Sequence, residues 1–88
     1  MRTRYLTYTA HAKILQLLKN SSAVAVNLTC AGECLGLDFV FEPREVELVE
    51  LSRVPRVCTD LQTLVKLKNG CVDFSYSAVG GEFIISRL

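Results

Sequence analysis

The chain has 88 residues, half of them hydrophobic, and its formal net charge is only +1. This length predicts a single domain spanning residues 1–88, and the composition excludes a disordered chain. The ten Lys and Arg residues form no run, so the charge pattern argues against a nucleic-acid-binding surface. The sequence has no apolar signal segment and no stretch long enough to span a bilayer, so we expect a cytoplasmic protein with no membrane partner.

The first predicted element is a helix that ends near Lys19. Thr7 or Thr9 can cap its N-terminus, because a Thr hydroxyl accepts a hydrogen bond from a backbone N–H of the first turn. Apolar residues then recur at helical spacing, which predicts one buried face. His11, the only histidine, falls in the first turn, where a surface residue is a simpler interpretation than a metal ligand.

Two alternating apolar runs follow at 24–28 and 37–41, which predicts two strands joined by an exposed turn. The segment between them carries two thiols, Cys30 and Cys34, and two glycines at 32 and 36. Glycine lets the backbone approach a bound ion or partner closely, so this segment is the candidate functional site.

A turn is predicted at 42–45 and a third strand at 46–51, with glutamates on the solvent-exposed face of the strand. A cation site could be formed by the four glutamates of the turn and strand, Glu42, Glu45, Glu47 and Glu50, but alternation along a solvated strand explains them more simply. Pro55 cannot donate to a central ladder, so residues 52–58 are predicted to form a turn and a short edge strand.

The pattern then changes to that of a short helix. Thr59–Gln62 fits a capping box, and Gly70 is placed to end the helix in a left-handed conformation. Residues 71–76 alternate between two faces, the glycines at 80 and 81 predict a turn, and 82–88 supply the last strand. Together the elements predict a small, mainly β (α+β) domain whose sheet is covered by helices.

The cysteines of the candidate site leave two interpretations open. Cys34 is either an exposed thiolate ligand or a packed residue, and Cys30 is either its co-ligand or the last core-facing residue of its strand. A dimer presenting both from each subunit would supply the four thiolates of an iron–sulfur cluster. Zinc is less well supported, because no second Cys or Cys/His pair has matching spacing. An enzyme is the weakest interpretation, because nothing places a base beside Cys34.

Several short motifs occur in a defined order along nearly the whole chain. They are Cys34-Leu35-Gly36, the aromatic-bearing run 37–41, the short helix with Gly70 behind it, Val72-Asp73-Phe74, and Gly80-Gly81-Glu82-Phe83. This order resembles the A-type iron–sulfur carrier family, also called HesB-like. The resemblance implies a small β-sandwich or pseudobarrel with an N-terminal helix and a short helix before the last two strands.

The same resemblance implies a role for one cysteine. The first cluster ligand of the family falls on Cys34, whereas the other two form a Cys-x-Cys pair beyond the last strand, which this sequence lacks. Cys30, Cys58 and Cys71 match no family position and inherit no role.

The first hypothesis is therefore a non-enzymatic iron–sulfur assembly or carrier-like protein. It would bind iron or a cluster through Cys34, as a homo-oligomer or together with assembly or recipient proteins. The alternative is a cluster-free interaction module that keeps the fold and binds a partner through the same loop or sheet surface.

Overall fold

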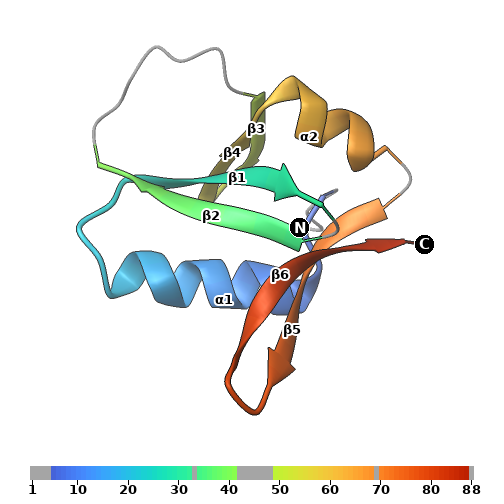
Figure 1. Cartoon of the computed structure of the whole chain (residues 1–88). Helices are drawn as coiled ribbons and strands as arrows, with labels where there is room; N and C mark the ends of the chain where they lie inside the picture. The colour runs from blue at the N-terminus through green and yellow to red at the C-terminus, as the bar shows by residue number, and fades with distance from the viewer. Residues whose placement is uncertain (1–4, 33, 42–48, 69, 88) are drawn as a thin grey trace.

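The structure is a computed structural model that describes residues 5–32, 34–41, 49–68 and 70–87. In this part of the chain, two helices and six strands follow one another (Figure 1). They are α1 (Tyr8–Lys19), β1 (Ala25–Ala31), β2 (Cys34–Val40), β3 (Val49–Arg53), β4 (Arg56–Thr59), α2 (Leu61–Lys66), β5 (Gly70–Ser77) and β6 (Gly80–Arg87). The mainly β prediction, with one helix near the N-terminus and a short one before the last two strands, is confirmed.

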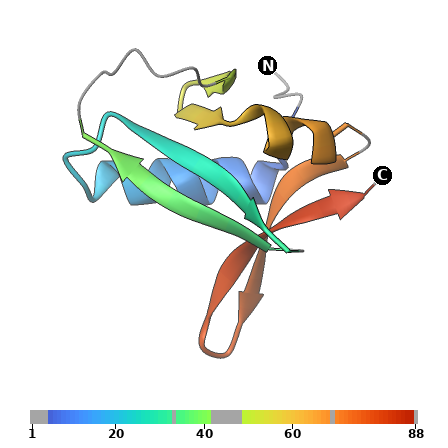
Figure 2. The ribbon, with the colours of Figure 1, turned by 45° about the horizontal axis from the view of Figure 1, so that its top comes forward.

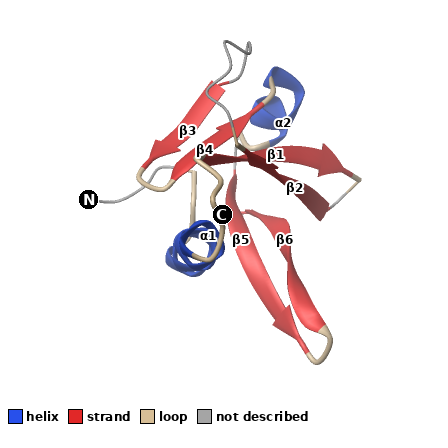
Figure 3. Cartoon of the chain, turned by 90° about the vertical axis from the view of Figure 1, so that its left-hand side faces the viewer, coloured by secondary structure: helices blue, strands red, loops and turns tan. Residues whose placement is uncertain are grey.

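The described strands form one sheet in the order β3-β4-β1-β2-β6-β5. The sheet curls, which agrees with the pseudobarrel form rather than with two stacked sheets, and the β5–β6 hairpin extends away from the rest of the molecule (Figure 2). Helix α1 lies between the two ends of the curled sheet, and α2 lies on the other side of the β1–β2 hairpin (Figures 1 and 3). The core is formed by apolar residues from both helical and strand segments, among them Ile14, Val26, Leu28, Val57, Leu67 and Val72.

Helix α1 begins and ends as the sequence predicts. The Thr7 hydroxyl caps it by accepting a hydrogen bond from the Ala10 N–H at 3.2 Å. The same hydroxyl donates to the Asp73 carboxylate of β5 at 2.6 Å, so the cap also anchors the helix to the sheet. Ala10 and Ile14 are fully buried and mark the face that meets the core.

The β1–β2 hairpin is longer than predicted and its turn is shorter. Its register runs from Ala25 opposite Val40 to Ala31 opposite Cys34. The predicted exposed turn over 29–36 is therefore wrong, because both cysteines belong to strands. Gly32, with φ of 69°, adopts a left-handed conformation that favours glycine.

Strand β4 is an interior strand, so the prediction of an edge strand at 52–58 is wrong. It pairs in parallel with β1 on one side and antiparallel with β3 on the other. Pro55 is compatible with this because it lies in the turn before β4, outside the ladder. Of the predicted third strand, residues 49–51 fall in β3, and the predicted turn at 42–45 lies outside the described residues.

Helix α2 starts differently from the prediction. Asp60 is the N-cap, and its carboxylate accepts a hydrogen bond from the Thr63 N–H at 2.7 Å, whereas Thr59 is buried in β4. The predicted left-handed stop at Gly70 is also wrong, because Gly70 begins β5 without a positive φ. Glycine is favoured at this position for a different reason, because a Cβ there would lie 2.5 Å from the Ser86 backbone oxygen.

The final hairpin turns at residues 78 and 79 rather than at the predicted glycines. Gly80 and Gly81 begin β6 with positive φ values of 127° and 153°. A Cβ at Gly81 would lie 2.6 Å from the Ser75 backbone oxygen, so close pairing with β5 favours glycine there. The Phe74 ring of β5 packs edge-on against Phe83 of β6, with centroids 4.8 Å apart.

Candidate metal site

Cys34 lies where the two hairpins of the sheet meet. As the first residue of β2, it pairs with Ala31 of β1 and with Ile84 of β6. Its side chain is half-buried, and its thiol donates a hydrogen bond to Glu82 Oε2 of β6 at 3.2 Å. The candidate site therefore consists of a thiol and a carboxylate that the fold brings together from residues 48 positions apart in the sequence.

A thiol and a carboxylate that share one proton offer two ligands to a metal ion, which binds the deprotonated forms and releases that proton. A tetrahedral ion held about 2.3 Å from sulfur and about 2.1 Å from oxygen would place the two ligand atoms roughly 3.6 Å apart. The observed separation is 3.2 Å, and Glu82 is exposed, so a small movement of its side chain would accommodate the ion.

Cys30 does not lie beside Cys34. Residues opposite one another in an antiparallel pair share a face, and successive residues alternate between faces. Cys30 lies opposite Leu35, and Ala31 lies opposite Cys34, so the two cysteines occupy opposite faces of the hairpin. The Cys30 thiol donates to the Gly32 carbonyl at 3.1 Å and its side chain packs against the hydrophobic core. Within one chain, the structure does not bring the two predicted metal ligands together.

The other two cysteines lie at sites where burial favours the neutral thiol. Burial raises the pKa of Cys58 in β4, against the opposing effect of the neighbouring Arg56 guanidinium. Burial also raises the pKa of Cys71 in β5, and the negative charge of Asp73 adds to this effect. Both are poorer thiolate sources than an ordinary cysteine at neutral pH, which is consistent with packing roles.

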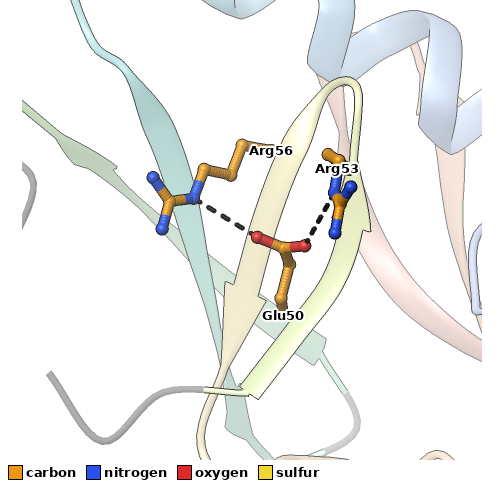
Figure 4. A network of polar contacts seen from close by, with 3 residues as sticks. All are labelled: Glu50, Arg53 and Arg56. Carbon is orange, nitrogen blue, oxygen red and sulfur yellow. Dashed lines mark ion pairs between the residues drawn. The ribbon is translucent and has the colours of Figure 1, made fainter. Parts of the chain in front are cut away.

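Two further residues considered from the sequence are engaged elsewhere. The Nε2 atom of His11 lies 3.1 Å from the Val54 carbonyl oxygen, at the turn between β3 and β4. Glu50 forms ion pairs with Arg53 at 3.7 Å and with Arg56 at 3.5 Å (Figure 4). These pairs are well exposed and stabilise the β3–β4 hairpin only weakly. Among the described residues, no three His, Cys, Asp or Glu side chains cluster as a metal site.

Glu82 is the site residue that the sequence analysis missed. It comes near Cys34 because Ile84 of β6 lies opposite Cys34, which places Glu82 two positions along the same face. The only signal in the sequence is a charged residue directly before the apolar run 83–85 of the last strand. That signal does not identify the strand against which β6 pairs.

Comparison of the sequence with models of known protein families and with curated proteins finds no match. In the part of the chain that the structure describes, no helix is long and apolar enough to cross a membrane.

Proposed function

We propose that this chain is a non-enzymatic, carrier-like protein of iron–sulfur cluster assembly, with Cys34 as a thiolate ligand and Glu82 as its neighbouring oxygen ligand. The observation that supports this proposal is the 3.2 Å contact between the Cys34 thiol and the Glu82 carboxylate. Cys34 is half-buried at the start of β2, so it does not belong to the fully buried core. The order of motifs that resembles the HesB-like family implies a cluster ligand at the same cysteine.

One chain supplies two ligands at this site, whereas iron–sulfur clusters are usually held by four. We therefore propose that the cargo, iron or a cluster, is shared with a second copy of the chain or with a recipient protein. A two-fold dimer would contribute two thiolates and two carboxylates. The reducing environment of the cytoplasm would keep the cysteines as thiols.

Anaerobic reconstitution with ferrous iron and sulfide tests this proposal. The wild-type protein is expected to gain a sulfur-to-iron charge-transfer band and to retain iron after desalting, with one cluster or ion per two chains in a homodimer. Cys34→Ser should lose both signals, and Glu82→Gln should weaken iron retention. Cys30→Ser is the matched control, because it removes a thiol four residues away on the opposite face. Equal iron retention by wild type and Cys34→Ser would refute the assignment.

The second candidate is a cluster-free interaction module built on the same fold. The placement of Cys30 and Cys34 on opposite faces favours it, because the hairpin of one chain then offers no two-thiol site. The same reconstitution separates the candidates: a protein that gains no charge-transfer band and retains no iron is the interaction module.

A further inference from the structure

Strand β2 has one edge that is paired over only a short part of its length. All seven of its residues pair with β1, whereas β6 pairs only with Cys34 and Leu35. Beyond this point the β5–β6 hairpin points away from the β1–β2 hairpin (Figures 1 and 2). No described strand therefore lies against residues 36–40 on the β6 side, which we call the open edge of β2.

The open edge presents backbone groups that can pair with another strand. The Val40 carbonyl accepts a hydrogen bond from the Val24 N–H at 2.8 Å, so the backbone of Val40 faces β1. Because backbone groups alternate in direction along an antiparallel pair, Gly36 and Asp38 also face β1. Leu37 and Phe39 therefore direct their N–H and C=O groups away from β1, toward the same side as Leu35, which pairs with β6.

The two outer edges of the sheet carry features that discourage pairing with other chains, and the open edge of β2 does not. At β3, the charged residues Glu50 and Arg53 and a bulge after Glu50 disrupt a regular edge. At β5, the segment before α1 covers the edge at Val72, whose N–H donates to the Tyr5 carbonyl at 2.7 Å. Residues 36–40 contain no Lys and no Pro, and their single charge is Asp38.

The side chains beside the open edge indicate what would bind there. One face carries two exposed carboxylates, Asp38 of β2 and Glu82 of β6. The other face carries Leu37, which packs against the core, and the partly exposed ring of Phe39. A second copy pairing antiparallel at this edge would bring the two Asp38 carboxylates onto one face at opposite or adjacent positions, which is unfavourable. A strand with basic residues on one face and apolar residues on the other matches both faces.

We propose that the open edge of β2 binds an extended segment of a partner protein in which basic and apolar residues alternate. The segment adds a strand beside residues 36–40, its backbone pairs with Leu37 and Phe39, and its basic side chains lie near Asp38 and Glu82. This inference deepens the second candidate function and rests on it. It does not require metal binding at Cys34.

The test is a titration of the reduced, metal-free, 88-residue chain with two synthetic peptides of alternating sequence, one of Lys and Val and one of Glu and Val. Binding is followed by amide NMR shifts and hydrogen exchange. The Lys–Val peptide should bind and slow exchange at Leu37 and Phe39, whereas the Glu–Val peptide should not. Asp38→Lys should weaken binding of the Lys–Val peptide by about threefold to tenfold. Glu50→Lys makes the same charge change at the β3 edge and should leave binding unchanged.

The proposal would be overturned by no binding of the Lys–Val peptide, by equal binding of both peptides, or by perturbations centred away from residues 36–40. Self-association of the free protein through β2 would also overturn it, because the occupant would then be a second copy. Asp38 is exposed, so its replacement is expected to leave the fold intact, which the amide spectrum checks directly. Because no metal is present, these results are independent of those of the iron reconstitution.

Discussion

Replacing Gly70 with alanine should destabilise the protein because of a clash between neighbouring strands. A Cβ at Gly70 would lie 2.5 Å from the Ser86 backbone oxygen and 3.4 Å from the Ile85 Cγ2 atom. Reaching ordinary van der Waals separation from the oxygen requires β5 and β6 to move apart by about 1 Å at this end. Overpacking of this kind costs about 1–3 kcal/mol, which for a domain of this size lowers the Tm by roughly 8–16 °C at 2 kcal/mol.

Urea unfolding followed by circular dichroism measures this loss, and two further variants identify its cause. Gly36→Ala is the matched control, because its Cβ would meet nothing closer than the Thr29 hydroxyl at 3.6 Å and should cost little. Gly70→Asn separates the clash from a left-handed helix stop, which asparagine tolerates. The clash predicts that Gly70→Asn is at least as destabilising as Gly70→Ala. A stable Gly70→Asn variant, or equal losses for Gly70→Ala and Gly36→Ala, would contradict the reasoning.

Three other predictions concern single side chains. Thr7→Ala should reduce the free energy of unfolding by about 1–2 kcal/mol, because the hydroxyl both caps α1 and donates to a carboxylate of β5. Thr7→Ser keeps the hydroxyl and should retain most of that free energy. Equal losses for the two variants in urea unfolding would refute the prediction. The hydrogen bonds from Thr63 lower the pKa of Asp60, so its stabilising effect is present above the ordinary Asp pKa and is lost as pH falls through the lowered value. Asp60→Asn should reduce this acid dependence in unfolding measured from pH 6 to pH 2, and an unchanged pH profile would count against it. Because burial raises the pKa of Cys58, the free energy of unfolding should fall as pH rises past the ordinary thiol range. Iodoacetamide at pH 8.5 should also alkylate Cys58 more slowly in the native protein than in the urea-unfolded chain. Equal alkylation rates by mass spectrometry would show that the thiol is accessible.

The features that were predicted correctly are those that depend on neighbours in the sequence. Helix α1 is an example, because its cap joins Thr7 to the Ala10 N–H only three residues away. The mainly β composition is another, because each alternating run shows its own period. The assignment of a candidate site to Cys34 stays a prediction, and its expected position in a wide turn is wrong because Cys34 is the first residue of β2.

The features that were missed depend on which strands become neighbours. Nothing local to Cys58 indicates that β4 pairs with both β1 and β3, so the proline before it was interpreted as evidence of an edge. Glu82 approaches Cys34 only through the register between β2 and β6. The alternation in β1 and β2 left the length of their turn undetermined, and a short turn places Cys30 and Cys34 on opposite faces.

The junction between β2 and β6 divides the sheet into two unequal parts, with β3, β4, β1 and β2 on one side and β6 and β5 on the other. Among the described residues, two pairs join these parts within the sheet, and the Cys34–Glu82 contact lies at the same junction. An ion bound by both side chains would therefore cross-link the two parts. After its release, the two parts would be joined in the sheet by the backbone pairs and by the thiol–carboxylate hydrogen bond. On the proposed carrier function, binding and release of the ion would therefore change how strongly the β5–β6 hairpin is held to the rest of the domain.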